Sequence, residues 1–301
     1  MASKKPAVLL LAHGSPDGLE DIPEFLSWVT RGRTVPLETI EEVKHRYSII
    51  GHSPLTHWTM RQRDLLAHEL GLPVYVGMRN WRPFIADTLR FMRADAIDHA
   101  LAICLAPQNS RTSVGLYRAD LNTQDAASLS IDFVDSWHNH AGLIQAFAEK
   151  LRAGWNRACC EAAAKVPVIF TAHSVPQRTI TEGDPYEAQA RETAALVAGA
   201  GSVAADDWRF AFQSQGMSGG PWLGPTVEDT IANLSQQGHG AVFLQPVGFL
   251  CDHVEVLYDI DVVFKDFAEE HAMRFWRAES LNDSRLLTAA LADLVHSRLK
   301  L

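Results

Sequence analysis

The chain has 301 residues, of which 47% are hydrophobic and 21% charged, and its formal net charge is -9. A length near twice that of a typical domain of about 150 residues predicts two domains. The composition is that of a globular protein and excludes a mainly disordered or collagenous chain. The acidic balance, without a block of basic residues, argues against a nucleic-acid partner.

The longest strongly apolar stretches, residues 7–12 and 166–172, have the length of strands. A bilayer-spanning helix needs about 20 apolar residues, so we expect no transmembrane segment. The apolar run that follows the N-terminal lysines ends at His13, too early for a signal peptide, so we expect a cytoplasmic protein. The four cysteines lack a metal-binding spacing, which favours reduced thiols without a structural zinc or Fe–S cluster.

Short apolar runs rich in strand-forming residues recur along the chain, with helical patterns between them. They cover residues 7–12, 73–76, 100–106, 130–134, 166–172, 209–213 and 241–247. Strands that alternate with helices predict parallel βαβ units. Because the runs are mostly continuous rather than alternating, we expect strands that helices cover on both faces. The predicted fold class is therefore α/β with doubly wound parallel sheets.

A weak internal repeat suggests how these units are grouped. Residues 10–16 resemble residues 170–176, and each segment ends a predicted strand with Ala-His. We therefore expect two similar doubly wound domains, residues 1–150 and 151–301, that face a central cleft at the carboxyl ends of their strands. The apolar stripe of the closing helix, about 284–300, is expected to pack back on the first domain.

The densest group of candidate functional residues follows the strand at 241–247. A helix is expected to begin near Asp252, a good N-cap residue. Glu255 and Asp259 are four residues apart, so their carboxylates point the same way. An acidic first turn also suits a helix dipole, but the position after a strand and beside His253 favours a site.

His173 follows another buried strand. A histidine there is often structural, yet across a cleft from Glu255 it would be a base near neutral pH or a ligand for a divalent metal. His13 has the same position in the first half, without acidic neighbours, so we assign it an indirect role. Arginines in the first half, Arg31, Arg33 and Arg46, are candidates to bind substrate carboxylates, although most surface arginines are simply solvated.

The chain resembles the ferrochelatases, which insert ferrous iron into a porphyrin. The matching segments run in family order at 51–55, 73–79, 106–108, 171–176, 182–186, 213–214, 221–225 and 246–261. The resemblance implies a class II chelatase-like fold, in which two Rossmann-like domains enclose a porphyrin cleft. It also implies that porphyrin and Fe(II) are the substrates.

The resemblance implies specific roles for individual residues. His173 and Glu255 are expected to be catalytic and to bind the metal from opposite faces of the macrocycle, and which of them takes a pyrrole proton stays open. The residues expected to orient or extend this pair are His253, Asp252, Asp259 and His13. Those expected to bind the porphyrin are Arg31, Arg33, Arg46, Ser53 and Tyr117. Val262 and Val263 stand where a further carboxylate of the family's acidic series is expected, and Asn109 replaces a usual aromatic residue.

The exact substrate is less constrained. The segment between Pro16 and Arg46 is too short for the long apolar lip of membrane-associated relatives, so the layout resembles the coproporphyrin ferrochelatases. This favours coproporphyrin III over protoporphyrin IX. The sequence stops at Leu301 without a cysteine cluster, so we expect no Fe–S centre. Whether the protein is a monomer or a homodimer stays open.

Three other functions remain to be distinguished. One is a chelatase for another metal or ring, such as cobalt and a sirohydrochlorin-type tetrapyrrole. Another is a tetrapyrrole-binding protein that has lost turnover, which the missing carboxylate suggests. The last is a nucleotide-binding oxidoreductase, but the first predicted strand lacks a following GxGxxG turn.

Overall fold

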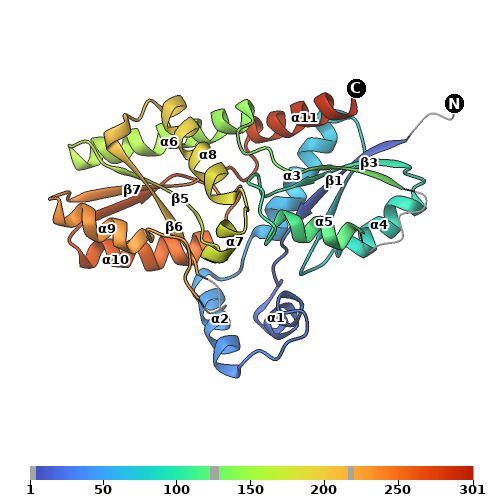
Figure 1. Ribbon diagram of the computed structural model, residues 1–301, viewed down its shortest axis with the longest axis horizontal. Coiled ribbons are helices and arrows are strands. Elements are labelled where there is room, and N and C mark those ends of the chain that lie inside the picture. The colour runs from blue at the N-terminus through green and yellow to red at the C-terminus, as the bar shows by residue number, and fades with distance from the viewer. Residues whose placement is uncertain (1–4, 123–128, 216–219, 301) are drawn as a thin grey trace.

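The computed structural model describes residues 5–122, 129–215 and 220–300, which contain two four-stranded sheets (Figure 1). The strand orders are β2-β1-β3-β4 and β6-β5-β7-β8, and all neighbouring strands are parallel. The strands are β1 (Pro6–Ala12), β2 (Val74–Met78), β3 (His99–Cys104), β4 (Ser130–Val134), β5 (Val168–His173), β6 (Trp208–Gln213), β7 (Ala241–Pro246) and β8 (Arg274–Arg277). The predicted α/β class with parallel sheets is confirmed.

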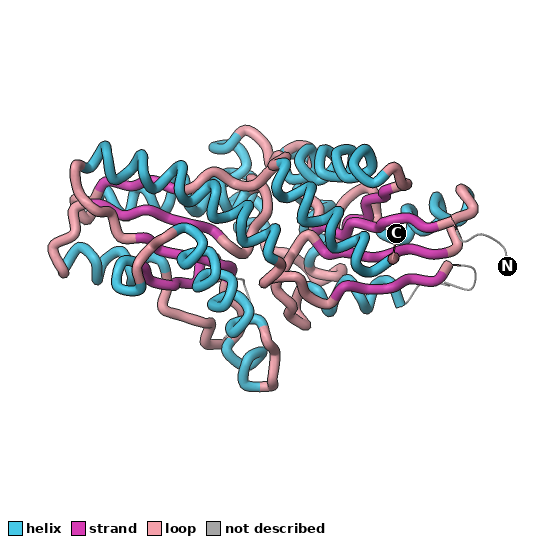
Figure 2. The backbone as a smooth tube through the Cα atoms, turned by 90° about the horizontal axis from the view of Figure 1, so that it is seen from above, coloured by secondary structure: helices cyan, strands magenta, loops and turns pink. Residues whose placement is uncertain are grey.

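Helices connect and cover the strands, and the strands form two separate groups when seen from above (Figure 2). The α-helices are α1 (Ile22–Val29), α2 (Leu37–Ile50), α3 (Leu55–Leu70), α4 (Ile85–Ala94), α5 (Val114–Asn122), α6 (Ala141–Ala162), α7 (Gln177–Thr181), α8 (Tyr186–Gly201), α9 (Val227–Gln236), α10 (Lys265–Glu270) and α11 (Arg285–Leu299). Two short 3-10 helices, η1 (Leu19–Asp21) and η2 (Ala205–Asp207), and one π-helix, η3 (Glu255–Phe264), complete the list.

One strand, β8, was not predicted from the sequence. It is an edge strand of four residues, Arg-Phe-Trp-Arg, that pairs only with β7 among the described strands. An edge strand is covered less than a central one, and none of the four residues is fully buried. It therefore lacks the continuous apolar run that made the other strands recognisable.

The two sheets have the same strand order, and this explains the internal repeat. β1 and β5 occupy equivalent positions, and a histidine stands at the carboxyl end of each: His13 directly follows β1, and His173 is the last residue of β5. Both imidazoles bind through Nδ1 to the carbonyl of the following residue, Gly14 in one half and Ser174 in the other. The repeated sequence thus encodes a repeated strand-to-loop turn.

The core is organised by the two-residue period of the strands. On β1, Leu9 and Leu11 pack with α4 and α5, whereas Val8 and Leu10 face the opposite layer. That second layer is continuous with the one over β5 and includes side chains of α3, α6, α8 and α11. The two sheets therefore share one apolar layer, with the remaining helices on their outer faces.

Helices α6 and α11 join the two halves. α6 packs against α8, β7 and β8, and α11 packs against both α6 and α3 (Figure 1). A division after residue 150 would fall inside α6. The predicted division into residues 1–150 and 151–301 therefore stays a prediction. None of the helices that the structure describes is long and apolar enough to cross a bilayer. The cytoplasmic location also stays a prediction.

The contact between α6 and α11 makes a testable prediction about two glycines. A Cβ on Gly142 in α6 would lie 2.9 Å from the Cβ of Ala290 in α11, whereas a Cβ on Gly199 in α8 has no neighbour within 4 Å. We expect Gly142→Ala to lower the free energy of unfolding by about 1–3 kcal/mol through overpacking. Gly199→Ala, the control, should raise it by about 0.5–1 kcal/mol, because alanine favours a helix. Urea unfolding measures both, and a gain in stability for Gly142→Ala would contradict this account.

Candidate active site between the two sheets

A cavity of about 560 Å³ lies where the carboxyl ends of the two sheets meet. Loops after β1, β3, β5 and β7 line it, together with α1, α2, α3 and the start of η3. Figure 1 shows α1 and α2 projecting from the body on the side where the two sheets meet. The volume falls within the range of small-molecule sites, and open α/β sheets bind ligands at this edge.

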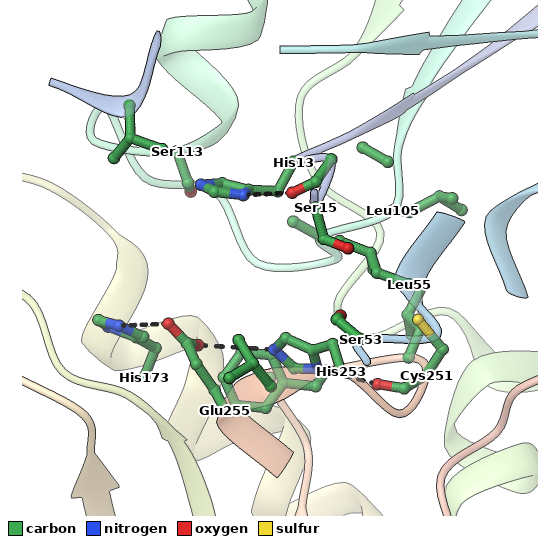
Figure 3. A pocket seen from close by; sticks show the side chains of 18 of the residues that line it. His13, Ser15, Ser53, Leu55, Leu105, Ser113, His173, Cys251, His253 and Glu255 are labelled. Atoms are coloured by element: carbon green, nitrogen blue, oxygen red, sulfur yellow. Dashed lines mark hydrogen bonds and ion pairs between the residues drawn. The ribbon is translucent and has the colours of Figure 1, made fainter. Parts of the chain in front are cut away.

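A cluster of three titratable side chains forms one wall of the cavity (Figure 3). The Glu255 carboxylate lies between two imidazoles, with Oε1 3.4 Å from His173 Nε2 and Oε2 3.6 Å from His253 Nε2. His173 ends β5, whereas His253 and Glu255 lie on the segment that leaves β7. A carboxylate in this position can accept protons from either ring.

The backbone determines which ring nitrogen of each histidine faces the carboxylate. Nδ1 of His173 binds the Ser174 carbonyl, and Nδ1 of His253 lies 3.1 Å from the Cys251 carbonyl. A carbonyl oxygen can only accept a hydrogen bond, so each Nδ1 carries a proton. Nε2 of both rings therefore points toward Glu255, either protonated or with a free lone pair that can bind a metal ion.

Burial and charge act in opposite directions on this cluster. Burial lowers the pKa of His173, but the adjacent Glu255 charge and hydrogen bond outweigh burial and raise that pKa to about 9. Burial raises the pKa of Glu255, yet His173 and then His253 hold it well below its ordinary value. Near neutral pH the pair is therefore an imidazolium and a carboxylate, each about one-third exposed.

The expectation that His173 and Glu255 lie on opposite faces of a macrocycle is wrong. Two groups on either side of an aromatic plane must be separated by about 7 Å, twice a van der Waals contact, whereas these two lie 3.4 Å apart. The reason is topological: β5 and β7 are adjacent parallel strands, so both side chains emerge at the same edge of one sheet. Both residues belong to the same wall of the cavity.

Glycine makes this close approach possible. A Cβ on Gly248, just after β7, would lie 3.0 Å from the Cβ of Ala172 on β5. A larger residue would push the segment that carries Glu255 away from β5. Gln213, at the end of β6, adds a further link, because its Nε2 donates to the Glu255 carbonyl at 3.3 Å.

The opposite wall comes from the first half of the chain. His13 lies there, across the cavity from Glu255 and next to Ser113 (Figure 3). Burial lowers the pKa of His13, so its imidazole is neutral near pH 7. Tyr47 on α2 also lines the cavity, and burial, followed by the negative charge of Glu255, raises its pKa. This wall is polar without carrying the acid-base pair.

Asp259 and Asp252, both predicted to support Glu255, have different positions. Asp259 lines the cavity one turn beyond Glu255; burial raises its pKa and the Ser214 hydroxyl donates to it. Asp252 does not line the cavity and does not cap η3, which begins three residues later at Glu255 with no side-chain cap. Its carboxylate instead accepts hydrogen bonds from Ser280 and Asn282, because the chain turns before the helix begins.

The predicted porphyrin-binding residues divide into two groups. Arg46, Ser53 and Tyr117 line the cavity. Arg31 and Arg33 do not: Arg31 pairs with Asp120 at 3.0 Å, and the Arg33 Nε donates to the Thr30 carbonyl. Arg46 forms an ion pair with Glu42 and lies 4.0 Å from Asp259 across the cavity mouth. A role for Arg31 and Arg33 stays a prediction.

The sequence analysis did not assign a role to several residues that shape the site. The hydroxyl of Tyr186 donates to the His173 carbonyl at 2.9 Å, and Thr171 donates to Gln213 at 3.1 Å. Gln213 ends β6 and Ser214 follows it, so their place at the same sheet edge as His173 was the available signal.

Comparison with known proteins identifies the family. The ferrochelatase profile matches residues 5–299. The chain belongs to the ferrochelatase family. A ferrochelatase of Acidobacterium capsulatum is 54% identical, covering 98% of this chain and 95% of that protein. A coproporphyrin III ferrochelatase of Geobacillus sp. strain WCH70 is 36% identical over the full length of both chains.

A solved structure supports the fold of this ferrochelatase-family chain. The sirohydrochlorin chelatase SirB of Bacillus subtilis subspecies spizizenii in complex with cobalt has a TM-score of 0.52 at 9% identity. The alignment covers 98% of this chain and 96% of the other. At this identity the likeness concerns architecture alone, and it confirms a two-domain chelatase fold. Family membership makes the protein a metal chelatase.

The side chains that could bind a metal ion in this ferrochelatase-family site do not surround one completely. Within the described part of the chain, no three His, Cys, Asp or Glu side chains are arranged to enclose a metal ion. Closed sets of four protein ligands are typical of structural metal sites. A metal ion that is passed on to another molecule needs fewer than four protein ligands. The two Nε2 atoms on either side of Glu255 form such a smaller set of ligands.

The pair of His173 and Glu255 makes a prediction that is independent of turnover. Glu255→Gln removes the negative charge that keeps His173 protonated, so the pKa of His173 should fall from about 9 toward its ordinary value. NMR titration of the imidazole measures this shift. Glu192→Gln, which alters the separate His138 pair at 2.8 Å, is the control and should leave His173 unchanged. An unchanged pKa of His173 in Glu255→Gln would disprove the coupling.

Proposed function

We propose that this protein inserts Fe(II) into coproporphyrin III. The observation that carries the proposal is the cluster of His173, Glu255 and His253, which opens into a 560 Å³ cavity in a chain of the ferrochelatase family. A cavity of that size between two rigid sheets suits a flat ring, and the cluster supplies both proton acceptors and metal ligands at one wall.

The reaction replaces two protons by one metal ion. A neutral free-base porphyrin carries two pyrrole N–H groups, and Fe(II) enters as both protons leave, so the product ring stays neutral. Glu255 is the acceptor closest to both histidines, and its carboxylate is ionised before the reaction. His173 and His253 can present Nε2 lone pairs to iron, because imidazole binds Fe(II) without the tight hold of a thiolate.

The protonation state of His173 determines the order of proton release and metal binding. Its pKa of about 9 means that the ring holds a proton near pH 7, and a metal ion must displace that proton before Nε2 can bind. Glu255 lies 3.4 Å away and can take the proton, and Asp259 extends the acidic surface toward Arg46. Metal binding and proton release therefore involve the same three side chains.

The opposite wall has a different task. The porphyrin must bend so that its nitrogen lone pairs point toward the entering metal, and binding energy from the rest of the ring supplies this distortion. His13 lies across the cavity from the acid-base cluster, and Phe25 and Tyr47 also line the cavity, so together they give the ring a polar and aromatic surface to bind against. Burial keeps His13 neutral, so it does not repel an incoming cation.

Polar groups in the cavity support coproporphyrin III, whose four propionates require charged and hydroxyl partners. Arg46 and Ser53 line the cavity, and a guanidinium and a hydroxyl can both donate to a carboxylate. The relative from Geobacillus named for coproporphyrin III covers the whole chain. The short segment after Pro16 forms α1 and α2, but Trp28 and Leu37 are exposed there, so its length alone does not decide against protoporphyrin IX.

Turnover on two porphyrins tests the substrate. We expect a higher kcat/KM for Fe(II) insertion into coproporphyrin III than into protoporphyrin IX, because only the first has four carboxylates for Arg46 and the hydroxyl groups. Anaerobic absorbance spectroscopy of the metalloporphyrin gives both values. Arg46→Ala should raise KM for coproporphyrin III more than it lowers kcat. A preference for protoporphyrin IX would reject the substrate, and binding without turnover on either ring would indicate a carrier.

Substitutions in the cluster test the catalytic assignment. We expect His173→Ala and Glu255→Gln each to lower kcat for metal insertion by about 10²–10⁴-fold, the usual contribution of a positioned acid or base. The dissociation constant of the porphyrin, measured by fluorescence quenching, should change little, because the ring is held mainly by the rest of the cavity. Glu192→Gln again serves as the control. Wild-type kcat in either cluster variant would remove that residue from the mechanism.

A further inference from the structure

The connection between β8 and α11 contacts the turn that leads to His253 and Glu255. Asn282 in this connection makes three hydrogen bonds to the turn. Its backbone N–H donates to the Leu250 carbonyl at 2.9 Å, its Oδ1 accepts from the Asp252 N–H at 2.8 Å, and its Nδ2 donates to the Asp252 carboxylate at 2.9 Å. Its φ of 46° is in the left-handed region, which asparagine adopts more readily than most residues. The backbone and side chain of Asn282 therefore together hold the turn at Leu250 and Asp252.

Arg277 at the end of β8 adds a second link. Its Nε and Nη2 donate to the two carboxylate oxygens of Asp261 at 2.5 and 2.8 Å, and Nη2 lies 3.3 Å from Asp252 Oδ1. Asp252 lies before η3 and Asp261 lies within it. The Arg277 side chain is only 16% exposed, so this bidentate pair is shielded from solvent. The guanidinium joins the turn to the helix that follows it.

The turn separates two cavities. Cys251 and His253 line the main cavity, whereas Asp252 lines a second, polar cavity of about 440 Å³ together with Arg277 and Asn282. Movement of this segment would shift the Cys251 carbonyl, which binds His253 Nδ1, and the helix start that carries Glu255. Displacements of about 1 Å in an active site can cost about 100-fold in rate.

The same connection also contacts the first half of the chain. Gln62 on α3, which lines the main cavity, donates from Nε2 to the Asn282 carbonyl at 2.7 Å. Asn282 is thus bonded to the wall that holds the acid-base cluster and to a helix that lines the other side. No residue of the 277–284 connection itself lines the main cavity.

We infer that Arg277 and Asn282 are positioning residues of the metal site, which hold His253 and Glu255 at the distances that let both imidazoles share one carboxylate. Neither residue touches the substrate. The inference rests on the proposed chelatase function, and it assigns a role in that function to contacts that lie outside the cavity.

Three variants test this inference. Arg277→Gln removes the charged bridge, and Asn282→Gly removes both side-chain bonds while tolerating the backbone conformation. The control is Glu279→Gln, because Glu279 lies between these residues, is 75% exposed and pairs with Lys150 at 2.9 Å without contacting the turn. Zn(II) insertion into coproporphyrin III, followed by fluorescence, gives kcat, and fluorescence quenching gives porphyrin affinity. Imidazole NMR signals report on His173 and His253.

We expect Arg277→Gln and Asn282→Gly to lower kcat by about 10–100-fold, as outer-shell substitutions at metal sites do. Porphyrin affinity should stay within about twofold, and the imidazole signals should shift, whereas Glu279→Gln should match the wild type. If Arg277→Gln does not fold, the result for Asn282→Gly alone tests the inference. Folded variants with wild-type kcat and unshifted imidazole signals, or an equal loss in Glu279→Gln, would overturn the inference. A wild-type protein that inserts no metal would instead reject the proposed function, and the imidazole signals would still test the positioning.

Discussion

The Glu255 carboxylate, held between the Nε2 atoms of His173 and His253, is the interaction on which the site depends. Burial by itself would favour the neutral carboxylic acid, and the two imidazoles reverse this preference. The carboxylate in turn keeps His173 protonated in spite of its burial. Because each charge is stable only with the other, protons and metal ions compete for one connected set of atoms. Such a set suits a reaction that exchanges two protons for a cation.

The fold makes this interaction possible through adjacent parallel strands. β5 and β7 are neighbours in the second sheet, so the residues that follow them emerge side by side. Gly248 lets the segment after β7 pass close to Ala172. Arg277 and Asn282, which do not line the main cavity, bind the turn before η3 and η3 itself through hydrogen bonds. The acid-base cluster is thus supported by strand pairing on one side and by a buried polar network on the other.

The two halves of the molecule share a strand order but differ in the charged groups that surround their equivalent histidines. His13 and His173 stand at the carboxyl ends of equivalent strands, and each binds the following carbonyl through Nδ1. Only His173 has a carboxylate opposite its Nε2, whereas burial leaves His13 neutral. In the proposed function, the wall that contains His13 binds the ring and the wall that contains His173 exchanges protons for metal. The two halves are similar in architecture and differ in the acidic segment that follows β7.

Several features followed from the sequence because they depend on local pattern. Continuous apolar runs predicted seven of the eight strands, and the repeated Ala-His segments indicated two similar sheets with a cleft between them. His173, Glu255, His253, Asp259 and Arg46, each of which follows a strand or lies within a recognisable motif, line the cavity, and their roles stay predictions. The edge strand β8 was missed because partial exposure removes the apolar signal.

The tertiary structure alone decided how these residues face one another. Local pattern shows that an element is buried but not which strand is its neighbour, so it could not show that His173 and Glu255 share one wall. It likewise could not show that Asp252 turns away from the cavity toward Asn282, or that Arg31 pairs with Asp120 outside it. These contacts join residues far apart in the chain, and only the packing of strands and helices brings them within bonding distance.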